Sequence, residues 1–160
     1  MIGRWQRDPG RALTRGERAL AQSVFGDAID PDRVRLHRAT WWPFQPRRYI
    51  MAPDGHIWFH PKGDAWRDDF AAAPLSLQAL LIHELTHVWQ HQTGLFLPLR
   101  RHPFCRYAYA IRPGQALDRY GIEQQAMIVQ DAFVARARRQ PDPVRDTILA
   151  DAGLTGQRHA

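Results

Sequence analysis

The feature that most constrains this chain is a pair of histidines four residues apart, in the segment HELTHVWQ at residues 83–90. On an α-helix, a step of four residues turns by about 400°, so His83 and His87 lie about 40° apart on one face. Both imidazoles can then reach a single tetrahedral zinc ion. Glu84 lies about 60° from His87 by the same arithmetic, where it can act on a water molecule at the metal. The motif predicts a zinc site with His83 and His87 as ligands and Glu84 as general base.

The surrounding sequence predicts that this motif stands on a helix. The helix runs from about Leu75 to Gln92, with Pro74 or Ser76 near its start and Gly94 just past its end. An apolar stripe supports it, formed by Leu77, Leu81, Leu85, Val88 and Trp89. The alternative is a chance match, in which one histidine packs in the core and the other lies at the surface. The helical context favours the metal site.

Two histidines do not complete such a site, because a catalytic zinc ion takes three protein ligands and keeps one position for water. One class of zinc peptidase has a glycine at position 90 and a histidine at position 93, but this chain has Gln90 and Thr93. Another class takes a glutamate from a later helix, and Glu123 is the only glutamate after the motif. We therefore predict Glu123 as the third ligand. The alternative is a carboxylate that only favours the N-terminal end of its helix dipole.

Other histidines and the one cysteine are rival ligands. Three histidines at successive helical turns spread over about 12 Å, so His91 is predicted to be a surface residue. His102 and Cys105 could pair or add a ligand, but no third group is placed to orient them, so a small buried cysteine is favoured. His56 and His60 share one face of a strand, where they either line the cleft or occupy exposed edge positions.

The whole pattern predicts an α+β fold, with one domain over residues 14–152 between a flexible leader at 1–13 and a polar tail at 153–160. Thr14 and Glu17 form a capping box that begins a helix at 15–25. The further predicted elements are a strand at 34–39, a β-hairpin at 49–60, a long loop at 95–117 and helices at 118–139 and 143–151. We expect a small antiparallel sheet with an edge hairpin, packed on the motif helix and the second long helix.

An aromatic segment interrupts the predicted strands. Trp41, Trp42 and Phe44 stand beside Pro43 and Pro46, which prevent regular structure from running through the segment. The three rings either cover the core or form an exposed patch for a partner. We expect them to cover the core.

Composition narrows the function classes. The net charge of +6 is carried by arginine, apart from Lys62, and the densest run, residues 136–139, falls at a predicted helix end where cations favour the dipole. No apolar run is long enough to span a bilayer, the N-terminal residues lack an apolar signal region, and the single cysteine excludes an internal disulfide. We expect a cytoplasmic protein, or one exported without a cleaved signal peptide, with no nucleic-acid or membrane partner.

Four segments together resemble a known family. The order VFG at 24–26, VRLH at 34–37, IWFHP at 57–61 and HELTHVWQ at 83–90 is similar to that of a bacterial zincin-like zinc-metallopeptidase domain associated with extracellular contractile injection systems. The similarity is greatest to its short stand-alone members, the vgr-related proteins, and covers roughly residues 13–135. It implies zinc held by His83, His87 and a glutamate of a later E-x-x-A segment, which EQQA at 123–126 matches. The family usually has an acidic residue next, where this chain has Met127.

These observations predict a zinc-dependent endopeptidase of the gluzincin type, in which Glu84 takes a proton from water and passes it to the leaving amine. Tyr120 is the candidate that stabilises the oxyanion, with Tyr107 and Tyr109 as further candidates. A peptide or protein substrate is expected to pair with the edge strand at residues 56–60. A secretion-system or toxin protein is a further candidate partner. The alternative function is a non-catalytic, metal-stabilised adaptor or scaffold module linked to a secretion or contractile injection system.

Overall fold

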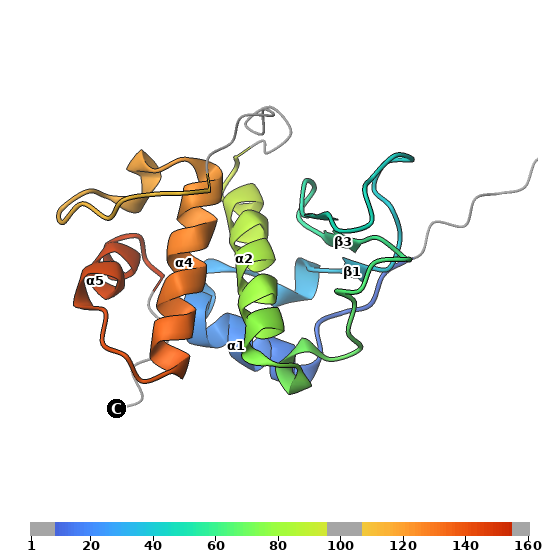
Figure 1. Cartoon of the computed structure of the whole chain (residues 1–160), viewed down its shortest axis with the longest axis horizontal. Helices are drawn as coiled ribbons and strands as arrows, with labels where there is room; N and C mark the ends of the chain where they lie inside the picture. The colour runs from blue at the N-terminus through green and yellow to red at the C-terminus, as the bar shows by residue number, and fades with distance from the viewer. Residues whose placement is uncertain (1–8, 96–106, 155–160) are drawn as a thin grey trace, which may run out of the picture.

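The computed structural model describes residues 9–95 and 107–154, which form an α+β fold. Figure 1 shows α2 between the sheet and α4, with α5 on the far side of α4. Four α-helices are described: α1 (Arg15–Phe25), α2 (Leu75–Gln92), α4 (Ile122–Ala137) and α5 (Pro143–Asp151). The three strands are β1 (Leu36–His37), β2 (Ile50–Met51) and β3 (Ile57–Phe59), and the short 3-10 helices are η1 (Gly26–Ala28), η2 (Pro31–Arg33), η3 (Phe70–Ala72) and η4 (Leu117–Arg119).

Local capping signals set the helix ends. The backbone N–H of Glu17 donates to Thr14 Oγ1 and the Glu17 side chain accepts from the Thr14 N–H, so the predicted capping box begins α1. The predicted starts and ends of α1, α2 and α5 are confirmed. The second long helix begins four residues later than predicted, at Ile122, because Gly121 is extended with φ −62° and ψ 156° and separates it from η4.

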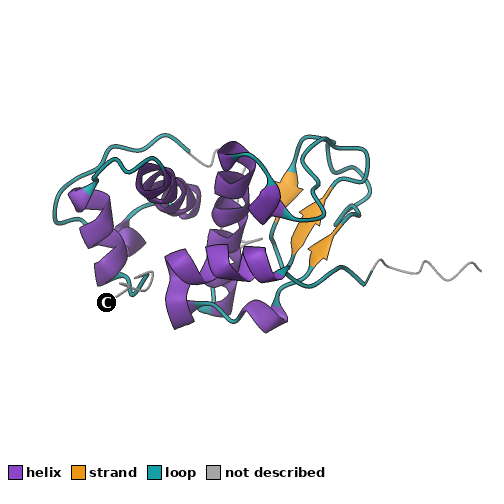
Figure 2. Ribbon diagram, turned by 90° about the horizontal axis from the view of Figure 1, so that it is seen from below, coloured by secondary structure: helices purple, strands orange, loops and turns teal. Residues whose placement is uncertain are grey.

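The sheet differs from the predicted antiparallel one. Its order is β1-β3-β2, in which β3 pairs parallel with β1 and antiparallel with β2. The predicted hairpin is present as β2 and β3, and its turn contains Gly55 with φ +83°. However, β3 is the central strand, with β1 paired along Ile57 and Trp58 on one side and β2 paired along Trp58 and Phe59 on the other. The prediction that a substrate pairs with an edge strand at residues 56–60 is therefore wrong. The strands are two or three residues long, and Figure 2 shows them at one end of the molecule.

The core lies around α2. Side chains from α1, β1, β3, α4 and α5 pack against this helix or against its neighbours, the largest fully buried ones including Phe25, Leu36, Phe59, Leu81, Ile128 and Leu149. No helix of the described residues is long and apolar enough to cross a membrane.

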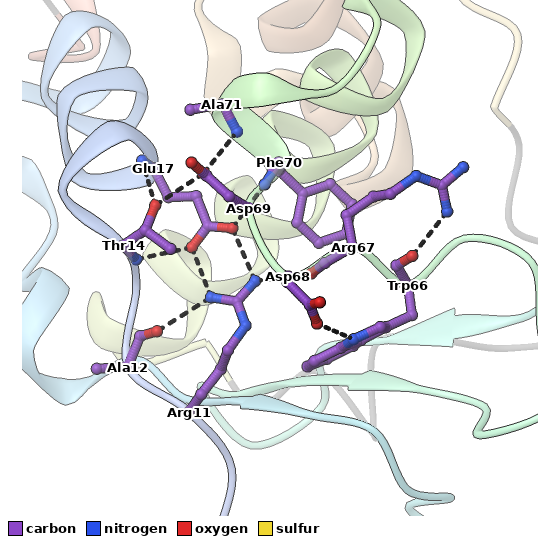
Figure 3. A network of polar contacts seen from close by, with 10 residues as sticks. All are labelled: Arg11, Ala12, Thr14, Glu17, Trp66, Arg67, Asp68, Asp69, Phe70 and Ala71. Atoms are coloured by element: carbon purple, nitrogen blue, oxygen red, sulfur yellow. Dashed lines mark hydrogen bonds and ion pairs between the residues drawn. The ribbon is translucent and has the colours of Figure 1, made fainter.

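A buried ion pair joins the start of the described chain to the segment before α2 (Figure 3). The Glu17 carboxylate accepts two hydrogen bonds from the Arg11 guanidinium, both at 2.8 Å, one from the Thr14 N–H at 2.8 Å and one from the Phe70 N–H at 2.9 Å. Arg11 also forms a β-bridge with Leu36. Part of the segment predicted as a leader thus contacts the folded body, whereas residues 1–8 and 155–160 lie outside the described residues.

The aromatic segment at residues 41–44 does not cover the core. Trp41 is 42% exposed, Trp42 is 40% exposed and Phe44 is 80% exposed, so the expectation that they cover the core is wrong. The next residue along the chain, Gln45, is buried instead.

Candidate metal centre

The predicted ligand pair stands on a helix that is enclosed on every side. All side chains from Leu81 to Val88 are buried, because the sheet, α1 and α4 pack around this part of α2. The helix start is held by the Gln78 side-chain amide, which donates to the carbonyls of Ala71 at 3.1 Å and Ala73 at 2.9 Å. A helix buried all round carries polar side chains only where other polar groups meet them. His83, Glu84 and His87 are such side chains.

The partner of the two histidines comes from the first turn of α4. Glu123 is buried and points towards α2, which packs along α4. Two amides hold this helix start. The Gly121 N–H donates to the Gln124 side-chain oxygen at 3.0 Å, and the Gln125 side-chain amide donates to the Tyr120 carbonyl at 2.9 Å. The sequence-based prediction brought these residues together by elimination, and the structure places Glu123 against both histidines.

The three predicted ligands converge on one point. Glu123 Oε2 lies 3.3 Å from His83 Nε2 and 3.1 Å from His87 Nε2, and one ligand atom from each residue lies within 4.8 Å of the others. The two imidazole rings stand at 78° with their centroids 5.1 Å apart. All three side chains are buried. This group of His83, His87 and Glu123 is called the triad below.

Two glutamines bind the far side of the imidazoles. His87 Nδ1 lies 2.8 Å from Gln90 Oε1, and His83 Nδ1 lies 3.1 Å from Gln130 Oε1. An amide oxygen can only accept, so each Nδ1 carries the proton and donates to it. Each Nε2 is then the nitrogen with the lone pair, unless the ring is doubly protonated. Hydrogen bonds of this kind fix the tautomer and the orientation of metal-binding histidines.

The orientation of the Gln90 amide is itself fixed. Its nitrogen donates to the Ile122 carbonyl and to the Gln125 side-chain oxygen, both at 3.0 Å. Gln125 in turn uses its own nitrogen on the Tyr120 carbonyl. Because both donors of Gln90 are used on α4, its oxygen must face His87. The side-chain amides of Gln125 and Gln90 therefore link the start of α4 to His87 and fix the tautomer of its imidazole.

This arrangement fits a metal ion. With both Nδ1 atoms protonated, two nitrogen lone pairs and a carboxylate oxygen face the same point in a buried space, and only a positive charge between them makes the geometry favourable. Protons on the imidazoles or a divalent cation can supply that charge. Two imidazole nitrogens and one carboxylate oxygen are the donor set of a catalytic zinc site, and three protein ligands leave a fourth position open.

Glu84 lies beside the triad without belonging to it. Its carboxylate is buried on the same helix, and among the described residues it is not one of the three grouped ligands. Burial lowers the pKa of His83, but the hydrogen bond to Glu123 and the charges of Glu84 and Glu123 raise it, and the net direction is upward. The negative charge of Glu84 thus favours the protonated form of His83, and its role as general base stays a prediction.

The three tyrosines proposed for the oxyanion lie in different environments. Tyr120 is buried, and its hydroxyl accepts a hydrogen bond from the Arg112 N–H at 3.1 Å. The Tyr109 hydroxyl donates to the Asp131 carboxylate and accepts from Arg145; burial and the Asp131 bond raise its pKa to about 12. Tyr107 is exposed. A role for Tyr120 in stabilising the oxyanion stays a prediction.

The rival ligands lie apart from the triad. His91 packs over Gly55, where an added Cβ would come within 2.7 Å of its ring, and it is half-buried rather than at the surface. His56 Nδ1 accepts from the Arg35 N–H at 3.2 Å, and burial lowers the pKa of His56. His60 Nδ1 accepts from the Lys62 N–H at 3.0 Å. His102 and Cys105 lie outside the described residues.

Met127 replaces the acidic residue that the resemblance leads one to expect. It is half-buried and lines a shallow pocket of about 440 Å³ with Tyr109, Ile111, Asp131 and Arg145. The outer nitrogens of the ligand imidazoles are bound by glutamines instead. The absence of an acid at position 127 therefore leaves both histidines oriented.

Sequence reasoning missed these glutamines. Gln90 is three residues after His87 and Gln130 is seven after Glu123, so each falls on the face of its helix that carries a ligand. This spacing was available in the sequence. What it does not specify is the direction of the amide, which depends on contacts between α2 and α4.

Known proteins resemble the chain closely in sequence and fold. No family model matches it. It is 42% identical over 146 residues to the type VI secretion system spike protein VgrG2b of Pseudomonas aeruginosa strain PAO1, an alignment that covers 85% of this chain and 14% of that protein. It superposes with a TM-score of 0.79 on the solved effector domain of Pseudomonas aeruginosa VgrG2b, with 39% identity, covering 97% of this chain and 89% of that one. The chain thus spans about one seventh of the curated relative and nearly all of its effector domain.

Proposed function

Since the chain belongs to the family of the VgrG2b effector domain, we propose that it is a secretion-linked effector module that acts as a zinc-dependent peptidase. The module is expected to act after export through such a system and to meet its peptide or protein substrate there. The zincin-like assignment and the enzymatic activity are part of this proposal.

The observation that supports the proposal is the convergence of the triad together with a fourth, separate carboxylate. Two imidazole nitrogens and Glu123 Oε2 face one point, and both imidazoles are fixed from behind by Gln90 and Gln130. A site that only stabilised the fold would need no further acid. Here Glu84 is buried next to a ligand, and its charge acts on His83.

Each residue has a defined part in the proposed reaction. A zinc ion bound by the triad would supply Lewis acidity, which polarises a carbonyl and acidifies water. Glu84 takes one proton from the attacking water, whose oxygen forms the new bond to the carbonyl carbon. Glu84 then gives that proton to the amide nitrogen as the C–N bond breaks, so a carboxylic acid and an amine leave. Gln90 and Gln130 keep the imidazole tautomers unchanged throughout.

The first test is the metal content of the full chain, by elemental analysis of the purified protein and of two ligand variants. We expect close to one zinc ion per chain in the wild type and loss of zinc in both His87→Ala and Glu123→Ala. Asp131→Asn, an acid change on α4 outside the triad, is the matched control and should keep its zinc. A wild-type protein that takes up no zinc even when metal is supplied contradicts the site.

The second test separates catalysis from metal binding. Glu84→Gln keeps the size of the side chain but removes the base, so we expect zinc to stay bound and zinc-dependent cleavage of a peptide library to be lost. Asp146→Asn, a change of a partly exposed acid on α5, is the control here and should cleave like the wild type. Unchanged cleavage by Glu84→Gln would sink the mechanism.

A non-catalytic, metal-stabilised adaptor is the second candidate, and the comparisons favour it in one respect. The two relatives are a type VI secretion system spike protein and its effector domain, which supports a secretion-linked module. This candidate is accepted if no peptide of the library is cut by the zinc-loaded wild type, while Glu84→Gln retains full stability and partner binding. Loss of cleavage in Glu84→Gln alone excludes it.

A further inference from the structure

The loop between β1 and β2 carries an exposed group of aromatic side chains. Trp41, Trp42, Phe44 and Tyr49 are between 40% and 80% exposed, and Phe44 is the most exposed of them. The Trp42 and Phe44 rings contact edge to face at a centroid distance of 6.1 Å. The sheet and this loop lie at the end of the molecule opposite α5 (Figure 1). We call residues 41–49 the aromatic loop.

The aromatic loop is held in place from inside by a polar residue. Gln45 is buried; its side-chain oxygen accepts from the Trp41 N–H at 2.9 Å, and its nitrogen donates to the carbonyls of Tyr49 at 2.8 Å and Trp58 at 3.3 Å. The Gln45 N–H also donates to the Trp42 carbonyl at 3.1 Å. The usual arrangement is reversed, because the amide lies inside while the large rings face water. Hydrogen bonds to Gln45 therefore hold the loop in a conformation that exposes the rings. Exposed apolar groups of this kind are typical of interaction surfaces.

The chain segment that carries these rings has charge of one sign. Between Asp32 and Asp54 there are five arginines and no acidic residue, and all five arginines are exposed: Arg33, Arg35, Arg38, Arg47 and Arg48. Arg47 and Arg48 lie within the aromatic loop and form no ion pair with another described residue. The loop therefore presents apolar rings in a positive field, and the surface that complements it is anionic and partly apolar.

We propose that the aromatic loop binds the surface of an anionic lipid bilayer. Tryptophan and tyrosine favour the boundary between headgroups and acyl chains, where the ring is buried and its polar edge stays wet. Phenylalanine at the most exposed position enters the acyl region, and each arginine near the surface is attracted to anionic lipid headgroups. The binding is peripheral. It revises the expectation of no membrane partner, which rested on the absence of a spanning segment.

Two other occupants fit the loop less well. A second copy of the chain would bring the same arginine cluster against itself, and like charges at an interface oppose association. A single-stranded nucleic acid stacks on aromatic rings along a positively charged groove. Phe44, at 80% exposure, touches too little protein to form the wall of a groove. A planar surface is the occupant that meets a protruding ring of this kind.

The test is cosedimentation of the full chain with vesicles of equal parts phosphatidylcholine and phosphatidylglycerol, beside vesicles of phosphatidylcholine alone. We expect binding to the first and little to the second. Trp42→Ser combined with Phe44→Ser should lower the partition constant by about tenfold or more. Arg47→Gln combined with Arg48→Gln should lower it roughly 25-fold at low salt, at about fivefold per charge. Brominated acyl chains should quench tryptophan fluorescence in the wild type and quench it much less in the ring variant, which binds more weakly and keeps only Trp41 of the two loop tryptophans.

The matched charge control is Arg138→Gln combined with Arg139→Gln, an exposed pair after the end of α4. This variant should bind vesicles like the wild type. Zinc content and thermal unfolding confirm that each variant is folded, so the outcome is separate from that of the metal centre. The proposal is overturned by absence of vesicle binding, by equal losses in the two arginine variants, or by ring variants that lose self-association or DNA binding instead.

Discussion

Two buried glutamates show how differently the same side chain is used in two regions of this molecule. Each oxygen of Glu17 accepts two hydrogen bonds, and its charge is balanced by the Arg11 guanidinium at 2.8 Å. Glu123 instead faces two imidazoles whose other nitrogens already donate to glutamines. The charge of the Glu17 carboxylate is thus neutralised by a side chain of the protein. The Glu123 carboxylate lies in a group of donors that an added positive charge stabilises, as expected for a metal ligand.

The largest expected effect is on the triad, through removal of the metal. With zinc about a thousandfold above its dissociation constant, the free energy of unfolding of the wild type should exceed that of the chelated protein by about 4 kcal/mol. Glu123→Gln should show no difference, because it lacks the third ligand. Denaturant unfolding with and without chelator measures both. A zinc-dependent gain in Glu123→Gln equal to that of the wild type would contradict the ligand assignment.

Loss of the Arg11–Glu17 ion pair should lower the free energy of unfolding by the same amount with and without zinc. Arg11→Met leaves the Glu17 carboxylate buried without its cation, and the free energy of unfolding should fall by about 3 kcal/mol, the lower end for such pairs because Arg11 is partly exposed. The fall should be equal with and without chelator. Arg18→Met, which breaks the exposed pair with Asp32, should cost less than about 1 kcal/mol. A lower zinc content in Arg11→Met would show that the two sites are coupled.

The glutamines behind the triad allow a sharper test of metal binding. Gln130 is half-buried and its oxygen accepts from His83, so Gln130→Leu removes one support with little other disturbance. Zinc affinity should fall by about tenfold, measured by competition with a chromophoric chelator. Gln130→Glu keeps the acceptor and should bind zinc at least as tightly as the wild type. Equal affinities in Gln130→Leu and the wild type would mean that the tautomer of His83 needs no support.

The smallest expected effect concerns the capping box beside Glu17. The Thr14 hydroxyl accepts from the Glu17 N–H and donates to Asp69 at 2.9 Å. Thr14→Ala should lower the free energy of unfolding by about 1 kcal/mol and leave zinc affinity unchanged. Ser at this position should restore most of the loss. A greater loss than that of Arg11→Met would show that the cap, rather than the ion pair, anchors this end of the molecule.

Local chemistry explains which parts of the fold could be predicted. The capping box at Thr14, the proline at 143 and the spacing of His83 and His87 act within a few residues, and the helices they begin or occupy appear where expected. The place of Glu123 followed from its being the only glutamate after the motif. The order of the sheet did not follow, because the pairing of β1 with β3 joins residues about twenty positions apart and leaves no local signal.

The exposure of the aromatic rings and the direction of the glutamine amides could not be predicted from the sequence either. Trp41 and Trp42 have the composition of core residues, and only the contacts of Gln45 show that the loop turns them outward. The same holds for Gln90, whose amide direction is set by Ile122 and Gln125 on another helix. The roles of buried polar residues such as Gln45 and Gln90 depend on contacts between distant segments, so no local sequence pattern indicates them.

The division of the triad between α2 and α4 has a consequence for the covalent chain. His87 and Glu123 enclose a segment of 35 residues that contains the arginines 100, 101 and 106, each followed by a residue other than proline. A single tryptic cut there would separate the HExxH helix and its glutamate ligand onto two polypeptides. Only helix packing and the shared zinc ion would then hold the two fragments together. Removal of zinc with a chelator should therefore let the fragments of the cut chain separate, and adding zinc should bring them back together.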